Sequence, residues 1–212
     1  MGAKNDYRAE IYGKYDSGFK KLGQSFDRAA AARLMRPLRF RFRGWLPSDR
    51  HAEIADVGCG SGALLHYFST LGYSRLSGVD ISAEQVAIAN QLGVTAVQGD
   101  ALSFLRRNAG KFDLLTSVDV IEHLTKPEGM EFLRACHAAI KPGGRLILQM
   151  PNGAAPWFGP TFFSDFTHET CYTPRLMADL LRLVGFVQPT SREVGPVPWG
   201  AGAVAALRYP LW

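Results

Sequence analysis

The feature that most constrains this chain is a glycine loop between a short apolar run and a helical stretch. The apolar run covers residues 54–57, and Gly58-Cys59-Gly60-Ser61-Gly62 follows it, before the helical residues 63–70. Glycine leaves room for a ligand against the main chain, and a helix that begins there offers the positive end of its dipole to an anion. The pattern predicts a strand, a ligand-binding loop and a helix, although a purely structural glycine turn would have the same sequence.

Apolar runs and helical stretches continue to alternate from residue 51 onward. Expected strands lie at 54–57, 76–79, 95–98, 113–117, 145–150, 186–193 and 203–209. Expected helices lie at 63–70, 82–92, 127–140 and 174–184, with Ser82 as an N-cap, the sequence KPGG at 141–144 as a stop and Gly185 as a C-cap. This alternation predicts an α/β fold with a doubly wound, mostly parallel sheet of seven strands. Such sheets bind ligands at the carboxyl ends of their strands.

The N-terminal quarter has a different character. Residues 1–48 favour helix, although Leu38–Arg43 alternates apolar and basic residues and fits either a short strand or a helix with a basic face. We expect an N-terminal helical lid or substrate segment at 1–48 and a ligand-binding domain at 49–212. Residues 1–50 hold 12 Lys or Arg against 5 Asp or Glu, whereas residues 51–212 hold 12 against 14. The basic excess favours an anionic or lipid-linked substrate or peripheral contact with a membrane, and a solvated helical face is the alternative.

The sequence contains neither a secretory signal nor a transmembrane run of about 20 apolar residues. Cys59, Cys136 and Cys171 are odd in number and widely spaced, which favours reduced thiols over a disulfide framework. We therefore expect a cytoplasmic protein. A monomer and a homodimer both fit these observations.

Two enzyme classes use a glycine loop of this kind. Gly58, Gly60 and Ala63 satisfy the dinucleotide pattern GxGxxG/A, and Asp80 follows about 20 residues later, as in an NAD-dependent dehydrogenase. However, Asp56 precedes the loop, and Asp100 and Asp119 also fall at or just after expected strand ends. These additional acidic residues favour a different ligand.

With them, residues 52–190 resemble the class I S-adenosylmethionine-dependent methyltransferases. The resemblance rests on five segments that occur in order, namely IADVGCGSG at 54–62, GVDIS at 78–82, GDA at 99–101, FDLL at 112–115 and KPGGRL at 141–146. It implies a Rossmann-like methyltransferase sheet that binds S-adenosyl-L-methionine.

The resemblance also implies individual roles. Asp80 would accept both ribose hydroxyls, Asp100 would accept the adenine amine, and Asp56 would face the methionine ammonium. N–H groups near Gly58 and Gly60 would bind the methionine carboxylate. The expected cofactor-binding residues are Asp56, Gly58, Cys59, Gly60, Gly62, Asp80, Ile81, Asp100, Ala101, Ser117, Val118 and Tyr15. Ile81 and Ala101 would sandwich adenine, and Tyr15 would meet the sulfonium by a cation–π contact. For each Asp, a helix cap or a solvated turn is the alternative.

A second polar cluster follows the fourth expected strand. Asp119, Glu122 and His123 have i, i+3, i+4 spacing and can share a helical face, and Asp165-Phe166-Thr167-His168-Glu169 comes later. This arrangement resembles small-RNA 2′-O-methyltransferases, whose ExxEH motif and a later His bind a divalent metal, with Asp119 here in place of Glu. Some ubiquinone-pathway O-methyltransferases are similar in the same region.

We expect Glu122, His123 and His168 to be catalytic. Asp119, Glu122, His123 and His168 are the candidate ligands for Mg²⁺, Mn²⁺ or Zn²⁺. Packing beside the cofactor without a metal is the alternative, in which His123 or His168 is still a candidate base.

Residues 151–186 are similar to methyltransferases from bacterial surface-polysaccharide and natural-product clusters, which implies O-methylation of a sugar, glycan or small-metabolite hydroxyl. Trp157, Phe158, Phe162 and Phe163 would line the substrate site or pack in the core. N- or C-methylation of a natural product, RNA 2′-O-methylation, an NAD-dependent dehydrogenase and an inactive partner subunit are the alternatives. We do not expect a nucleic-acid partner, because the sequence has no RNA-binding module.

Overall fold

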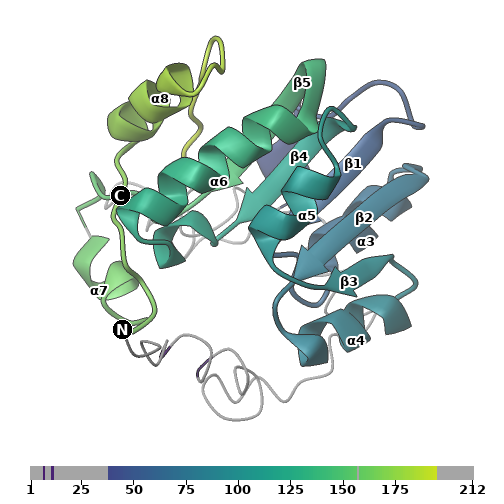
Figure 1. Ribbon diagram of the computed structural model, residues 1–212, viewed down its shortest axis with the longest axis horizontal. Helices are drawn as coiled ribbons and strands as arrows, with labels where there is room; N and C mark the ends of the chain where they lie inside the picture. The colour runs from purple at the N-terminus through teal and green to yellow at the C-terminus, as the bar shows by residue number, and fades with distance from the viewer. Residues whose placement is uncertain (1–6, 8–10, 12–37, 157, 195–212) are drawn as a thin grey trace, which may run out of the picture.

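The computed structural model describes residues 7, 11, 38–156 and 158–194 (Figure 1). Its centre is a sheet of five parallel strands in the order β3-β2-β1-β4-β5. The strands are β1 (Glu53–Val57), β2 (Arg75–Asp80), β3 (Ala96–Gln98), β4 (Phe112–Val118) and β5 (Ile140–Gln149). The strand order reverses between β1 and β4, and in an open α/β sheet the ligand crevice lies at that point.

Helices cover both faces of this sheet. They are α3 (Ala63–Thr70), α4 (Ala83–Gln91), α5 (Ala101–Arg107), α6 (Lys126–Ala139), α7 (Phe158–Phe162) and α8 (Pro174–Leu183), with a short 3₁₀ helix, η2 (Ile121–His123). In Figure 1, α5 and α6 lie in front of the sheet and α3 lies behind it. Leu38 and Phe42 pack with α3 against that second face. The result is a three-layer α/β arrangement, as the alternation of elements predicts.

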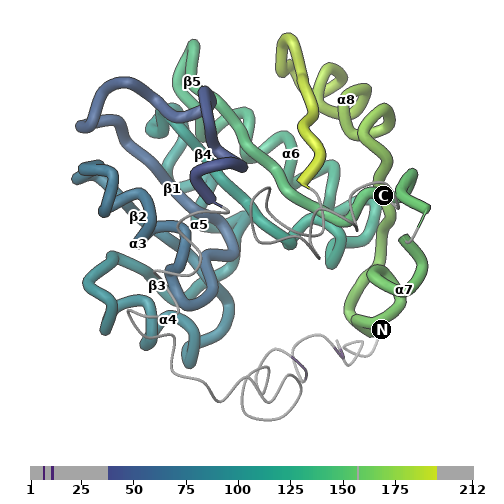
Figure 2. Tube along the Cα trace, turned by 180° about the vertical axis from the view of Figure 1, so that it is seen from behind, coloured from purple at the N-terminus to yellow at the C-terminus, as the bar shows by residue number. Residues whose placement is uncertain are grey.

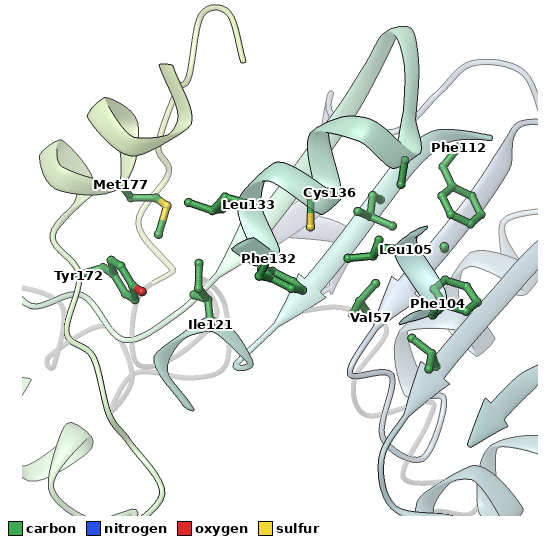
Figure 3. Packing of buried hydrophobic residues seen from close by; sticks show 14 residues of the cluster. Val57, Phe104, Leu105, Phe112, Ile121, Phe132, Leu133, Cys136, Tyr172 and Met177 are labelled. Atoms are coloured by element: carbon green, nitrogen blue, oxygen red, sulfur yellow. The ribbon is translucent and has the colours of Figure 1, made fainter. Parts of the chain in front are cut away.

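The larger core cluster lies between the sheet and helices α5 and α6 (Figure 3). α6 buries Phe132, Leu133, Cys136 and Ala139, which recur at helical spacing on one face. They pack with side chains from β1, β4 and α5, including Phe112, which is fully buried. Each large apolar side chain buried in this way contributes about 1.5–3 kcal/mol to stability. This packing holds the strand ends that carry the candidate site.

Five of the seven expected strands are confirmed close to the expected positions. β5 is longer than expected, because it begins at Ile140 rather than Arg145. Its register against β4 shifts between the pairs Phe112–Ile140 and Leu114–Arg145, so KPGG is an excursion within the strand. The expected strand at 203–209 lies outside the described residues.

The expected strand at 186–193 is wrong. Gln188 has a positive φ of 51° and Val187 is 84% exposed, so the segment has neither strand geometry nor a buried face. Instead, the Arg192 guanidinium donates to the carbonyls of Phe40, Arg41 and Arg43 at 3.3, 2.9 and 3.0 Å. Phe40 and Arg41 lie in a helix at residues 38–42. Of the two alternatives for Leu38–Arg43, a strand or a helix, the structure therefore has the helix. Figure 2 shows the 38–45 segment and the chain up to residue 194 on the same side of the sheet.

Most expected helices begin and end close to the predicted residues. Ser82 caps α4 by accepting from Gln85 N, as expected, and Thr125 forms a capping box with Glu128 at the start of α6. Helices α5 and α7 were not expected. Within the described residues, no helix is both long enough and apolar enough to cross a bilayer. Cys59, Cys136 and Cys171 are free thiols.

Candidate active site

The glycine loop turns sharply between β1 and α3. Gly58, Gly60 and Gly62 have φ values of 74°, 50° and 78°, in the region that favours glycine. A Cβ on Gly58 would lie 2.2 Å from Val120 Cγ2, and one on Gly62 would lie 2.7 Å from Val94 Cγ2. On Gly60 the nearest atom, Gln85 Oε1, would be 3.5 Å away. The outer two glycines are therefore required by packing, whereas the middle one faces more open space.

Asp80 connects this loop to the end of β2. Its Oδ2 accepts from Gly60 N at 2.8 Å, and its Oδ1 accepts from Ser82 N at 2.9 Å. Gly58 N donates to Val79 O at 2.8 Å. The N–H groups of Gly58 and Gly60, which we expected to bind the methionine carboxylate, therefore already donate within the protein. A carboxylate oxygen can accept more than one hydrogen bond, so these two contacts are compatible with the expected ribose role of Asp80.

Asp56 is a buried carboxylate beside this loop. It is 3% exposed, and its Oδ1 accepts from Thr116 Oγ1 at 2.7 Å. Burial raises the pKa of Asp56 to about 7, against the effect of the Thr116 hydrogen bond and with a contribution from the Asp80 charge. Because burial disfavours the charged form of this side chain, a cationic ligand group beside it would stabilise the carboxylate.

The expected adenine-binding residues lie at the ends of β2 and β3. Ile81 is 53% exposed, so its side chain is available to a flat ligand. Asp100 is the N-cap of α5, and its Oδ1 accepts from Ser103 N at 2.8 Å. The capping role that was the alternative for Asp100 is therefore present in the structure. Ala101 is partly buried and packs against the α5–α6 core.

The remaining expected cofactor residues that the structure describes also make contacts within the protein. Ser117 is buried, and its Oγ donates to Val57 O at 3.0 Å between β4 and β1. Val118 packs on the α3 side of the sheet. Cys59 is buried so closely against Gly78 that a Cβ there would lie 2.7 Å from the Cys59 Sγ. Tyr15 lies outside the described residues.

The second cluster assembles without one of its expected members. One ligand atom from each of Glu122, His123 and His168 lies within 4.8 Å of the other two. Glu122 is 1% exposed, and the two imidazole centroids are 4.7 Å apart. Asp119 does not belong to this group, which corrects the expected four-ligand set. Because η2 begins only at Ile121, the expected i, i+3, i+4 helical face does not form, and the exposed Asp119 carboxylate accepts from Gln149 Nε2 instead.

Hydrogen bonds from a distant loop hold this cluster together. Glu122 O accepts from Glu169 N at 2.8 Å and from Thr170 N at 3.0 Å. The ring nitrogen Nδ1 of His123 lies 2.8 Å from Thr167 Oγ1, and that of His168 lies 2.6 Å from Phe162 O. The fully buried Thr167 was not singled out in the sequence, because its contact with His123 spans 44 residues and leaves no local signal.

This cluster lies next to the glycine loop. Val120, which directly precedes η2, is the residue whose side chain would meet a Cβ on Gly58. From the N-terminal segment, the Tyr7 hydroxyl donates to Glu169 Oε1, and the Tyr7 ring meets Phe166 edge-on at 5.6 Å. The glycine loop, η2 and the 165–170 loop therefore form one continuous site.

The expected aromatic wall divides into two parts. Phe162 is buried and packs against both Phe158 and His168, with ring centroids 4.9 Å apart in each case. Phe163 and Phe166 are exposed. Trp157 lies outside the described residues.

The N-terminal part of the sequence contains a basic run of Arg36, Arg39, Arg41 and Arg43, and its described members have different partners. Burial raises the pKa of Tyr67, and the Arg39 charge partly offsets this effect, so Arg39 lies near Tyr67. The charge that acts on Arg41 is that of Asp119. Burial lowers the pKa of Arg41, and Asp119 partly offsets this effect. The fourth member, Arg36, lies outside the described residues.

Comparisons with known proteins agree with this geometry. A family model described as a methyltransferase domain matches residues 26–188. A ubiquinone biosynthesis O-methyltransferase from Burkholderia ambifaria is 33% identical over 122 residues, which cover 51% of this chain and 50% of that protein. One from Haemophilus ducreyi is 30% identical over 130 residues, which cover 56% and 54%. The chain thus spans about half the length of the curated relatives it matches. The structure of a SAM-dependent methyltransferase from Archaeoglobus fulgidus shares the fold, with a TM-score of 0.64, 24% identity, and 82% of this chain and 74% of that chain covered.

Proposed function

The chain belongs to the class I S-adenosylmethionine-dependent methyltransferases, and on that premise we propose that it transfers a methyl group from S-adenosylmethionine to a hydroxyl of a small molecule or glycan. The cluster of Glu122, His123 and His168 beside the glycine loop carries this proposal. A hydroxyl is a weak nucleophile until its proton is removed, and this cluster offers two imidazoles and a carboxylate for that purpose.

The donor side of the site fits S-adenosylmethionine. The two Asp80 oxygens have lone pairs for ribose hydroxyls, and the exposed Ile81 side chain offers an apolar surface for adenine. The buried Asp56 carboxylate suits the methionine ammonium, because an adjacent cation would offset the cost of its burial. Family membership argues against the NAD-dependent dehydrogenase alternative.

The transfer is a direct displacement in which positioning supplies most of the rate enhancement. The acceptor oxygen forms a bond to the methyl carbon as the sulfur–carbon bond breaks, and the electron pair of that bond returns to sulfur to leave S-adenosylhomocysteine. The acceptor proton moves to an imidazole nitrogen of His123 or His168. The second imidazole and Glu122 would hold the acceptor oxygen in line.

A metal-assisted form of this reaction is the second candidate. The cluster offers ligands for Zn²⁺ or Mn²⁺ through Glu122, His123 and His168. Imidazole suits Zn²⁺, and carboxylate suits Mn²⁺. A metal held by these three residues would lower the pKa of the acceptor hydroxyl. The burial of Glu122 supports this candidate, because a buried carboxylate is stabilised by a nearby cation.

The acceptor class is inferred from three observations. The matched relatives are named ubiquinone biosynthesis O-methyltransferases, which favours an oxygen acceptor and makes phenolic hydroxyls reasonable test compounds. The resemblance described for residues 151–186 in the sequence would extend the test compounds to sugar and natural-product hydroxyls. An anionic or lipid-linked acceptor fits the basic N-terminal residues.

The proposal is tested with the purified protein and methyl-labelled S-adenosylmethionine on a panel of phenols, sugars and amines. We expect protection by S-adenosylhomocysteine but not by NAD in a thermal shift, and transfer to a hydroxyl acceptor. His123→Ala should lower kcat by about 100-fold or more while S-adenosylhomocysteine still binds. His51→Ala is the control, since His51 is exposed and bonds to Ser74 rather than to the cluster.

Three other outcomes would redirect the proposal. Transfer to amines only, unaffected by His123→Ala, would replace it with N-methylation. Loss of activity with a chelator, restored by Zn²⁺ or Mn²⁺ but not by Mg²⁺, would favour the metal-assisted form. Binding of S-adenosylhomocysteine without transfer to any acceptor would favour an inactive partner subunit.

A further inference from the structure

We infer that Asp165 and Thr167 form a hydrogen-bonded relay that fixes the proton of His123 on Nδ1, and that the Phe162 carbonyl does the same for His168. Both imidazoles would then present Nε2 as their basic nitrogen. The catalytic use of these nitrogens rests on the proposed function, whereas the tautomers follow from the hydrogen bonds alone. Asp165 and Thr167 are accordingly positioning residues, because they act through His123.

The hydroxyl of Thr167 determines the direction of the relay. Its Oγ1 lies 2.6 Å from Asp165 Oδ1 and 2.8 Å from His123 Nδ1. Asp165 Oδ1 also accepts from Thr167 N at 3.0 Å, so this oxygen is an acceptor. A hydroxyl has a single proton to donate. If that proton points to Asp165, Oγ1 turns a lone pair to His123, and Nδ1 must be the donor.

The second imidazole is fixed by a simpler contact. The Phe162 carbonyl oxygen, 2.6 Å from His168 Nδ1, can only accept, so Nδ1 must carry the proton. Phe162 is buried, and its ring packs 4.9 Å from the His168 ring at 36°, which restrains the ring orientation. The two imidazoles reach the same tautomer through independent partners.

This arrangement has a direct chemical consequence. A neutral imidazole with its proton on Nδ1 has its lone pair on Nε2, where it accepts a proton or binds a metal. A partner that holds the other ring nitrogen raises the basicity of that lone pair and orients it. Without Thr167, nothing in the relay would keep the His123 proton away from Nε2, and a neutral His123 would offer its lone pair in the wrong direction for part of the time.

Burial keeps water from taking the place of Thr167 in the relay. Thr167 is fully buried, so water does not replace its hydroxyl without a rearrangement. The carboxylate, the hydroxyl and His168 all lie within four consecutive residues, whereas His123 lies on η2. The 162–168 segment therefore orients both imidazoles, His123 through the Thr167 side chain and His168 through the Phe162 main-chain carbonyl.

The tautomers are measured directly by NMR of the ¹⁵N-histidine-labelled protein at a pH where the imidazoles are neutral, without any acceptor substrate. We expect Nδ1–H for both His123 and His168, assigned with His123→Gln and His168→Gln. Thr167→Val keeps the side-chain shape but removes the hydroxyl, and should shift His123 toward Nε2–H. His168 should not change in that variant, and Thr167→Ser should restore the His123 tautomer. An Nε2–H tautomer at His123 in the unaltered protein, or no change in Thr167→Val, would overturn the inference.

A second variant tests the relay from its other end. Asp165→Ala removes the acceptor of the Thr167 proton, so the hydroxyl is free to donate to His123 and should also drive it to Nε2–H. This variant keeps the test valid if Thr167→Val does not fold. A His123 tautomer that is unchanged in Asp165→Ala would likewise contradict the relay.

Kinetics separate this inference from the proposed function. Thr167→Val should lower kcat by about tenfold or more with little change in S-adenosylhomocysteine affinity, and Thr167→Ser should recover most of it. If the tautomers change as expected but His123→Ala leaves activity intact, the relay stands and the proposed chemistry fails. If His123→Ala abolishes activity but the tautomers do not respond, the relay fails alone.

Discussion

The two halves of the site are built from contacts of very different length along the chain. On the donor side, Asp80 binds Gly60 N across 20 residues and Ser82 N across 2, and Asp100 binds Ser103 N across 3. On the acceptor side, Thr167 meets His123 across 44 residues, and Thr170 meets Leu124 across 46. Apart from Asp56, which accepts from Thr116 across 60 residues, the donor half is therefore specified by short motifs, whereas the acceptor half exists only once the 162–170 loop has packed onto η2.

The largest expected effect tests whether the donor half is arranged for its ligand rather than for stability. Because the pKa of Asp56 rises from 3.8 to about 7 on folding, its contribution to stability is complete below pH 4 and is lost as the pH rises through 7. Asp56→Asn should therefore change the free energy of unfolding more favourably at pH 8 than at pH 5, by a difference of about 3 kcal/mol. Urea unfolding at the two pH values measures this difference.

The same variant should bind S-adenosylhomocysteine more weakly in isothermal titration calorimetry. Asp113→Asn is the control of opposite sign, because the hydrogen bond from Lys141 lowers the pKa of Asp113. Its loss should destabilise the protein at pH 8 rather than stabilise it. If the effect of Asp56→Asn on stability is the same at pH 5 and pH 8, the interpretation of Asp56 as a buried, unfavourably charged ligand group is contradicted.

The next effect concerns the glycine loop, where a positive φ and close packing against Val120 both favour glycine at position 58. Gly58→Ala would force a Cβ to 2.2 Å from Val120 Cγ2 and should lower the free energy of unfolding by about 3 kcal/mol. Gly93→Ala is a matched control, because Gly93 has a similar φ of 81° with nothing within 4 Å of the new Cβ. It should cost about 1 kcal/mol. Equal losses in urea unfolding would mean that the backbone conformation alone requires glycine at position 58.

A smaller effect tests the contacts of Arg192 with residues 40–43, which are distant in the sequence and lie outside the site. Arg192→Ala removes three hydrogen bonds to the carbonyls of residues 40, 41 and 43, and a contact with the Trp45 ring at 4.1 Å. We expect a loss of about 1–2 kcal/mol in thermal or chemical unfolding, with Arg192→Lys intermediate. Arg182→Ala is the control, since the Arg182–Asp179 pair is exposed and should contribute under about 0.5 kcal/mol. Similar values for the two arginines would show that the 186–194 segment is dispensable.

The smallest effect separates the two roles of Asp100. Asp100→Ala should cost about 1 kcal/mol through loss of the α5 N-cap, and should also weaken S-adenosylhomocysteine binding. Asp100→Ser restores a capping oxygen but not the carboxylate, so stability should recover while affinity stays low. Recovery of affinity together with stability would show that Asp100 is only a cap.

The accuracy of the sequence-based predictions follows the same division. Apolar runs bounded by glycine or aspartate located the five central strands, and the motif spacing located Asp56, Asp80 and Asp100 at strand ends. Helix α5 was missed because Asp100 was interpreted as a ligand-binding residue. That Asp100 could also cap a helix beginning at Ala101 was not used to predict that helix. The strand expected at 186–193 failed because a short apolar pattern does not show whether a partner strand is available to it.

The acceptor cluster was predicted in composition but not in geometry. Glu122, His123 and His168 meet as expected, although Asp119 turns away because its positive φ of 54° and the late start of η2 remove the helical face. Thr167 and the Phe162 carbonyl orient the two imidazoles, and neither has a sequence signature, because a backbone oxygen or a single hydroxyl acquires this role only through tertiary contact.

The three thiols described above differ in depth, and this gives the protein a graded chemical reactivity. Cys171 is exposed, Cys59 belongs to the glycine loop and is buried against Gly78, and Cys136 is buried on the core face of α6. Burial raises the pKa of the Cys59 and Cys136 thiols, so neither forms the reactive thiolate while covered. In a Cys171→Ser background, the rate of alkylation at Cys59 would therefore report how often the loop opens, and that at Cys136 would report how often the whole domain unfolds. A bound donor molecule would slow the first rate in proportion to how firmly it holds the loop closed.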